Sequence, residues 1–220
     1  MEKRLLLHLK FTKQAVYNHP MSKKIYQFKI VLKDTKPPVW RRIQVPEDYS
    51  FWDLHITIQD AMGWMDCHMH GFELPNPAKL AINSRFAYAK GTRIGTKMDE
   101  DLFDTEMLDE QTEKIKKWFS LEECPKAEYT YDYGDTWEHW IILEKILPSE
   151  EGQKYPVCLK GKRQCPPEDC GGVWGFDDIC KGKHHAQEHY KHYDPHEEFD
   201  PAQVIFDDPK ERWEETKELL

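Results

Sequence analysis

The sequence lacks any run of about 18 apolar residues, so no stretch has the length of a transmembrane helix. It also lacks a glycine-rich phosphate loop, because Gly91 and Gly95 do not fit the spacing of the dinucleotide or P-loop motifs. The six cysteines form no pair of C-x₂-C hooks, and no nucleophile stands beside a base in a known catalytic motif. These absences argue against a membrane-spanning protein and leave no signature of a nucleotide-binding enzyme.

Positive charge is also scarce, with 31 Lys and Arg against 40 Asp and Glu and a net charge of −9. This balance argues against tight, nonspecific binding to nucleic acid. A local basic patch stays open, and its best candidates are Arg41, Arg42, Lys79, Arg85, Lys90 and Arg93. The more ordinary interpretation, solvated charges on strands and loops, is favoured.

Large rings are plentiful: aromatic residues make up 13% of the chain, while apolar residues in total make up 39%. The predicted core therefore depends on rings more than on aliphatic side chains. The N-terminal sequence LLLHL is too short for a signal-peptide core, so we expect a cytoplasmic protein with reduced thiols.

Hydrophobic alternation predicts strands at residues 25–33 and 39–45, followed by a helix at 51–62. Ser50 is a suitable N-cap for this helix, and Gly63 a suitable stop. A strand, strand, helix order is the opening of a β-grasp-like layer. We therefore expect an α+β fold, with a single domain built on a mixed or antiparallel sheet.

The most informative stretch is a central aromatic hairpin at residues 128–147. Tyr129, Tyr131 and Tyr133 alternate, Gly134-Asp135 supplies a turn, and a second apolar run follows. If Gly134 has a positive φ in this turn, a β-branched residue at its position would be destabilising.

Other segments give weaker predictions. We expect strands at 85–89 and 115–119, an exposed loop or short helix at 99–110, an irregular segment at 155–172 and a helix at 174–180. Residues 1–20 are expected to be a flexible N-terminal extension, residues 21–206 the domain, and residues 207–220 a C-terminal helix capped by Asp207 or Asp208.

Several ordered motifs extend over residues 22–206. They are Pro38-Val39-Trp40-Arg41-Arg42, Met62-Gly63-Trp64, His68-Met69-His70-Gly71-Phe72, residues 131–139 (YDYGDTWEH), residues 165–172 (CPPEDCGG) and Phe199-Asp200-Pro201. By these motifs the chain resembles the Ri-plasmid ORF-three-like family, found on plasmids, insertion elements and chromosomes. The resemblance implies a compact α+β protein associated with mobile elements, and it supplies no catalytic residues.

The cysteine loop, residues 158–170, is one candidate site. Cys158, Cys165 and Cys170 could hold a structural zinc ion, with His139 as the fourth ligand or with His68 or Cys180 in its place. The alternative is a Pro-stiffened loop with buried, reduced thiols, and it is favoured because the spacing is nonstandard. In either case we expect the loop to pack against the central hairpin, because a Pro- and Gly-rich loop makes few backbone hydrogen bonds of its own.

The hairpin turn is a second candidate site. Asp132, Asp135, Glu138 and His139 lie beside it in the sequence. His68, His70, Glu168 and Asp169 are candidates to join them. Carboxylates with imidazoles are the groups that hydrolytic metal centres use. The alternative, favoured because no standard motif is present, is that the aspartates fix the turn and the histidines belong to a polar core.

Two functions follow. The first is a non-enzymatic accessory or binding protein, with a protein or nucleic-acid partner and no membrane, presenting an open aromatic or charged surface. The second is a metal-assisted hydrolase, which should gather His68, His139, Asp132 and Asp135 in one cleft. The sequence favours the first.

Overall fold

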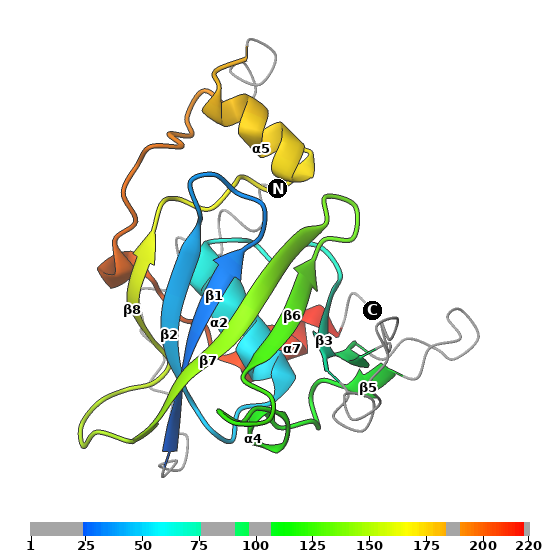
Figure 1. Ribbon diagram of the computed structural model, residues 1–220, viewed down its shortest axis with the longest axis vertical. Coiled ribbons are helices and arrows are strands. Elements are labelled where there is room, and N and C mark those ends of the chain that lie inside the picture. Colours follow the sequence, from blue (N-terminus) through cyan, green and yellow to red (C-terminus); the bar gives the residue numbers. More distant parts are fainter. Residues whose placement is uncertain (1–23, 76–90, 97–106, 184–189, 218–220) are drawn as a thin grey trace.

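One eight-stranded sheet forms the body of the protein (Figure 1). The computed structural model describes residues 24–75, 91–96, 107–183 and 190–217. The strands are β1 Lys24–Leu32, β2 Trp40–Pro46, β3 His70–Leu74, β4 Thr92–Gly95, β5 Met107–Asp109, β6 Lys126–Tyr131, β7 Trp137–Pro148 and β8 Val157–Lys162. Their order is β5-β4-β3-β6-β7-β1-β2-β8, and β4 with β5 is the parallel pair among antiparallel ones. The expected α+β fold with a mixed sheet is confirmed.

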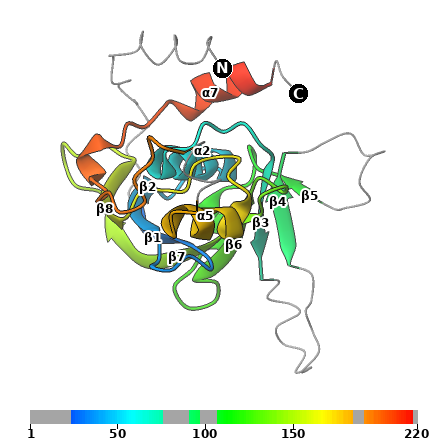
Figure 2. The same ribbon diagram turned by 90° about the horizontal axis from the view of Figure 1, so that it is seen from above.

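The helices lie at one face and one end of this sheet. They are α2 Phe51–Met62, α4 Ile115–Trp118, α5 Gly172–Cys180, a 3₁₀ turn η1 Pro201–Gln203 and α7 Pro209–Thr216. Seen from above, α2 lies against the sheet and α7 lies beyond α2, while α5 covers the end of the sheet (Figure 2). Among the described residues, every helix falls short of the length and hydropathy needed to cross a membrane.

The opening of the chain forms as predicted. β1 and β2 pair antiparallel, and Ser50 then caps α2 by accepting a hydrogen bond from the Asp53 backbone nitrogen. Gly63 ends the helix in the left-handed conformation, at φ 88°. This unit places the apolar stripe of α2 against the inner face of the sheet.

The core between α2 and the sheet is largely aromatic, as the composition predicts. Phe28 on β1 meets Phe119 edge-on with ring centroids 4.9 Å apart, and Phe51 on α2 meets Phe72 on β3 at the same distance. All four rings are buried. Edge-to-face contacts of this kind add to the hydrophobic contribution of each ring.

The C-terminal helix α7 begins at Pro209 and is capped by Asp208, in agreement with the prediction. It docks on α2 through a tryptophan pair: Trp52 donates from Nε1 to the Pro209 carbonyl oxygen at 2.7 Å, and its ring meets Trp213 edge-on at 5.1 Å.

The central hairpin also forms, from β6 and β7. Its turn does not use a positive φ at Gly134. The left-handed residues are Asp132, at φ 54°, and Thr136, at φ 57°, while Gly134 is not left-handed. Asp132 tolerates this conformation because its side chain bonds locally, with Oδ1 accepting the Gly134 backbone N–H at 2.8 Å.

Three weaker predictions are wrong for all or part of their residues. Residues 115–119 hold the short helix α4 rather than a strand, because Ile115 and Phe119 reach the core equally well in one helical turn. β5 lies within the predicted acidic loop, and Glu110 after it is buried. β8 lies within the predicted irregular segment, where β2 offers it a pairing partner. The predicted extension at residues 1–20 and the predicted strand at 85–89 lie outside the described residues.

Candidate functional site

The end of the central hairpin meets the cysteine loop. Asp135 in the hairpin turn accepts the Gly171 N–H at 3.1 Å, and Tyr131 on β6 donates its hydroxyl to Glu168 at 2.5 Å. Trp64, just after α2, donates from Nε1 to the Pro166 carbonyl oxygen at 2.9 Å. The predicted packing of the loop against the hairpin is therefore confirmed.

Glycine is required at this junction. Gly172 has φ +65°, and a β-carbon there would lie 2.4 Å from the Asp135 carbonyl oxygen. No L side chain fits that approach without moving backbone atoms, so the glycine lets the loop lie directly on the turn.

A half-exposed cluster of one imidazole and two carboxylates forms beside this junction. We call His68, Asp132 and Asp169 the edge cluster. The distance from His68 Nε2 to Asp169 Oδ1 is 3.1 Å, and that to Asp132 Oδ2 is 3.7 Å. The three ligand atoms all lie within 4.8 Å of one another. Two of these residues, His68 and Asp132, are predicted catalytic candidates, and Asp169 is one of the residues expected nearby.

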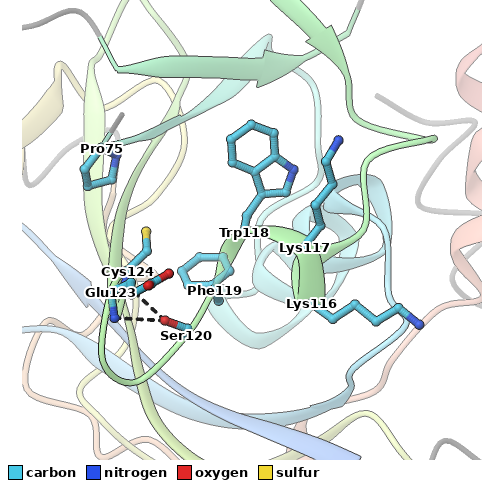
Figure 3. A pocket seen from close by; sticks show the side chains of 8 residues that line it. All are labelled: Pro75, Lys116, Lys117, Trp118, Phe119, Ser120, Glu123 and Cys124. Carbon is cyan, nitrogen blue, oxygen red and sulfur yellow. Dashed lines mark hydrogen bonds between the residues drawn. The ribbon is translucent and has the colours of Figure 1, made fainter. Parts of the chain in front are cut away.

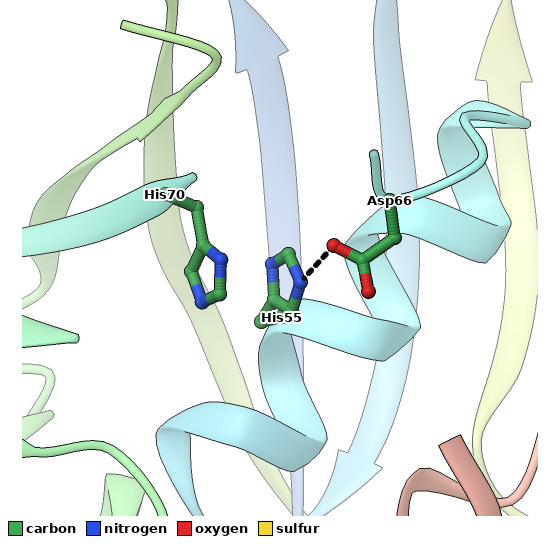
Figure 4. Close-up of side chains that lie close together, drawn as sticks. All are labelled: His55, Asp66 and His70. Atoms are coloured by element: carbon green, nitrogen blue, oxygen red, sulfur yellow. Dashed lines mark hydrogen bonds and ion pairs between the residues drawn. The ribbon is translucent and has the colours of Figure 1, made fainter. Parts of the chain in front are cut away.

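A second, fully buried pair of histidines lies under the sheet. We call His55 on α2 and His70 on β3, with their carboxylate partners Asp66 and Glu110, the buried imidazole pair. Figure 4 shows the two rings and Asp66. His55 is bonded through both ring nitrogens, to the Tyr129 hydroxyl at 2.8 Å and to Asp66 at 2.9 Å. His70 Nε2 lies 2.6 Å from Glu110 Oε2.

The surroundings separate the pKa values of the two rings. Burial, together with the neighbouring His70, lowers the pKa of His55. Burial also opposes protonation of His70, but the charge of Glu110 and its hydrogen bond outweigh it and raise that pKa. A proton on this pair is therefore favoured on His70 and disfavoured on His55.

The geometry of the buried imidazole pair is unfavourable for a metal. The rings are parallel within 3° and their centroids are 3.3 Å apart. A metal lies in the plane of each imidazole that ligates it, and two planes stacked in parallel share no such point. We therefore assign His55 and His70 to a polar core, the structural alternative for His70.

Three other catalytic candidates have separate positions. His139 is fully buried and burial lowers its pKa to about 3, so it is a poor base near neutral pH. Asp135 is occupied by Gly171. Glu138 points to the opposite face of the sheet, where it pairs with Lys33. Of the four residues that a hydrolase should gather, only His68 and Asp132 come together.

The four predicted zinc ligands do not share one coordination sphere. Within the described residues, no cysteine belongs to a group of three or more possible ligands. Burial raises the pKa of the Cys170 thiol to about 12 and raises that of Cys165 as well. Zinc binding by Cys158, Cys165, Cys170 and His139 stays a prediction, and it would require the cysteine loop to rearrange.

Arg41 is not part of a surface patch. Its side chain is buried, with Nε donating to the Ala61 carbonyl oxygen at 2.8 Å and the guanidinium 3.6 Å from the Phe199 ring centroid. It joins α2 to the segment around η1. Arg42 points the other way, and Lys79, Arg85 and Lys90 lie outside the described residues.

The face of the sheet opposite α2, which we call the outer face, carries tryptophans and cations in two adjacent rows. Cross-strand pairing aligns Trp140, Val31, Trp40 and Lys162 in one row. The next row is Lys126, Ile142, Lys29, Arg42 and Lys160. No described helix packs over this face (Figure 2).

The cations of the outer face are held over the indoles. Lys33 and Lys126 place Nζ 3.9 Å and 3.1 Å from the Trp140 ring centroid. Lys29 and Arg42 lie 5.1 Å and 5.3 Å from that of Trp40. An open hollow of about 730 Å³ lies beside them, lined by Gln27, Arg42, Glu144, Lys145, Leu159 and Lys160.

A smaller hollow of about 220 Å³ lies around α4 (Figure 3). Its walls include Trp118, Phe119 and Lys117, with Ser120 bonded to the Glu123 and Cys124 backbone nitrogens. None of the predicted site residues lines it, and it offers no cluster of acids, bases or nucleophiles in reach of one another.

Sequence reasoning missed His55, Asp66 and Glu110 as members of the polar core. The available signal was a histidine within the apolar stripe of the predicted helix, since His55 lies between Phe51 and Ile58 at helical spacing. Glu110 gave no signal, because it ends an acidic stretch that is typical of an exposed loop.

Comparisons with known proteins agree with this fold. Residues 24–208 match the model of the "Plasmid pRiA4b ORF-3-like protein" family. A solved structure, a protein of unknown function, MM3350, from Methanosarcina mazei Go1, is 40% identical with a TM-score of 0.72, covering 84% of this chain and 98% of that one. The uncharacterized protein y4hQ of Sinorhizobium fredii is 27% identical over 157 residues, which are 71% of this chain and 72% of that protein.

Proposed function

Because this chain belongs to the plasmid pRiA4b ORF-3-like family, whose description states no activity, we propose a function from its geometry: it binds single-stranded nucleic acid on the outer face of its sheet. The observation that supports this most is the pair of adjacent rows, one with two tryptophans and one with four cations.

The charge of the outer face is opposite to that of the whole protein. On strands β6, β7, β1, β2 and β8 the carboxylates of this face are Glu128, Glu138 and Glu144. They are outnumbered by Lys29, Lys33, Arg42, Lys126, Lys160 and Lys162. A locally positive surface attracts phosphates even on a protein of net charge −9, although the overall charge limits affinity and makes binding sensitive to salt.

The indoles provide surfaces on which bases can stack, an interaction that the attraction of phosphates to cations does not include. Bases stack on aromatic side chains with about 1–3 kcal/mol each, whatever their sequence. Trp140 and Trp40 are two strands apart, a separation of about 10 Å, so two bases of one strand could use both. The lysines over the rings need to move aside. A cation–π contact at an exposed site costs about 0.5–1 kcal/mol to break, and Lys33, whose side chain is 14% exposed, must also leave its ion pairs with Glu128 and Glu138.

The hydrolase alternative has less support. It needs His68, His139, Asp132 and Asp135 in one cleft, and two of the four are used elsewhere: His139 in the core and Asp135 in holding the cysteine loop. A binding protein needs an open aromatic and charged surface, and the outer face has both properties.

The test is fluorescence anisotropy with a short, labelled oligothymidylate at low salt. Trp140→Ala should weaken binding about tenfold or more, following the energy of one stacked base. Trp174→Ala is the matched control, since Trp174 is 85% exposed but lies on α5 at the end of the sheet, and it should bind like wild type (Figure 1). Lys126→Ala should reduce the dependence of affinity on salt.

Three results would overturn the proposal. The first is no oligonucleotide binding by the wild type at low salt, and the second is an equal loss in Trp140→Ala and Trp174→Ala. The third is a dimer in light scattering that Trp140→Ala dissociates, which would assign the outer face to a second copy of the chain.

A further inference from the structure

The edge cluster joins three segments that are far apart in the sequence. His68 lies between α2 and β3, Asp132 in the hairpin turn, and Asp169 in the cysteine loop. The cluster is open to solvent on one side: the Asp169 side chain is 75% exposed, whereas that of Asp132 is 11% exposed. The cluster therefore has one buried carboxylate and an open side that water can reach.

The unused donor atoms point at one another. Asp132 Oδ1 is occupied by the Gly134 N–H, which leaves Oδ2 to face His68. His68 Nε2 is shielded from solvent and makes no hydrogen bond of acceptable geometry, although carboxylate oxygens lie 3.1 Å and 3.7 Å away. A buried ring nitrogen that faces two carboxylate oxygens and has no hydrogen bond is placed where a metal ligand could be.

The spacings agree with a coordination sphere. Four ligands at about 2.0–2.1 Å from a tetrahedral zinc ion lie about 3.3 Å from one another. The two distances from His68 Nε2 bracket this value. We propose that His68, Asp132 and Asp169 bind a divalent first-row transition metal ion, with water completing the shell.

The donor set selects among metals. One imidazole with two carboxylates suits Zn²⁺, Mn²⁺ or Fe²⁺, whereas Ca²⁺ and Mg²⁺ prefer oxygen ligands alone. The hydrogen bonds from Gly171 to Asp135 and from Tyr131 to Glu168 already join the cysteine loop to the hairpin. A bound metal ion would strengthen this connection. Its position at the end of the sheet makes this site independent of the outer face.

The experiment is calorimetric titration of chelator-treated protein with Zn²⁺, and in parallel with Mn²⁺, Mg²⁺ and Ca²⁺. Wild type should bind one Zn²⁺ at the strongest site, and Asp169→Asn and His68→Gln should each weaken it by at least about tenfold. Asp169→Asn changes an exposed side chain and should keep the fold, so its loss of metal is not a folding effect. Weaker binding of Mg²⁺ and Ca²⁺ is expected.

Two controls separate this site from other possible ligands. His192→Gln removes an exposed histidine outside the edge cluster, and Cys165→Ser removes a thiol from the cysteine loop. Both should bind Zn²⁺ as wild type does, and the Co²⁺-loaded protein should show no thiolate charge-transfer band. The proposal is overturned if Asp169→Asn binds Zn²⁺ unchanged, or if Cys165→Ser loses the metal and Asp169→Asn keeps it.

Discussion

The imidazole rings of His55 and His70 stack face to face, 3.3 Å apart and 3° from parallel. Each has its own buried carboxylate, Asp66 for His55 and Glu110 for His70. Because two charged rings at this distance would repel each other, a proton on one ring disfavours a proton on the other. This part of the core is therefore sensitive to pH.

Removing the carboxylate that charges His70 should make the stability loss depend on pH. The pKa of His70 is raised above 6.5, its value in the unfolded chain. This shift stabilises the folded protein below pH 6.5, and the stabilisation is lost as the pH rises through the folded-state pKa of His70. The lowered pKa of Glu110 contributes stability above its unfolded value of 4.5, lost as pH falls through its folded pKa. The pair thus contributes most between these two values. Glu110→Gln should lower the free energy of unfolding by about 3–5 kcal/mol near pH 5.5, the usual result of breaking a buried ion pair, and by less near pH 8.5.

Chemical denaturation at both pH values measures this difference. Glu214→Gln, which affects an exposed pair with Lys217, should change stability little at either pH. An equal loss for Glu110→Gln at both values would mean that His70 in the folded protein does not change its protonation between them.

Asp60 should make the docking of α7 stronger at low pH. Burial, together with the charge of Asp207, raises the pKa of Asp60 to about 7. Arg212 offsets this only in part, because it lies 2.5 Å from Asp207 and 3.4 Å from Asp60. Since the folded state then binds the proton more tightly than the unfolded state, stability falls as pH rises from about 4 to 7, by up to about 1.4 kcal/mol per unit.

Asp60→Asn keeps a neutral group at this position and should remove that part of the slope. The free energies of unfolding of the two proteins, measured across this range, give the comparison. Parallel curves would show that Arg212 keeps Asp60 ionised throughout.

Trp137 should be among the largest single contributors to stability. Its ring is fully buried at the start of β7, 5.9 Å from the ring of Trp64. Trp137→Ala should cost about 3–5 kcal/mol, because a large cavity stays in the core. Trp174→Ala removes an indole that is 85% exposed and should stay within about 0.5 kcal/mol of wild type. Thermal and urea unfolding measure both, and equal effects would place Trp137 outside the cooperative core.

The two glycines at the hairpin junction should respond differently to alanine. Gly172→Ala meets a positive φ and a carbonyl oxygen at 2.4 Å, so we expect a loss of more than about 1 kcal/mol. Gly134→Ala meets only Asp132 Oδ1, at 3.1 Å, and should lose less. The thermal midpoint and the rate of proteolysis in the cysteine loop test this order. The reverse order would mean that the loop does not lie on the turn.

The sequence alone predicts the elements that are specified by local patterns, such as hydrophobic alternation and helix caps. The alternation in β1, β2, β6 and β7 identified the centre of the sheet. Side-chain caps at Ser50 and Asp208 marked the starts of α2 and α7 correctly. Such signals depend on neighbours a few residues away, and the unfolded chain already contains them.

Tertiary structure decided the elements that need a distant partner. β8 is a strand because β2 presents an unpaired edge to it, and β5 because β4 does. Ile115 and Phe119 fit either a strand or a helical turn in sequence, and the space between α2 and the sheet selected the turn. Arg41 and Arg42 are adjacent in the chain, but Arg41 is buried and Arg42 is half-exposed. They differ because their side chains point to opposite faces of the sheet.

The same division holds for the candidate sites. The sequence identified His68 and Asp132 as residues capable of binding a metal, and indicated that the hairpin meets the cysteine loop. It could not decide that His70 turns inward to Glu110, that Asp135 is used to hold Gly171, or that His139 is buried. The chemistry of a side chain is a property of its residue type, but its protonation and its partners depend on burial and on atoms brought from distant segments, which only the folded chain provides.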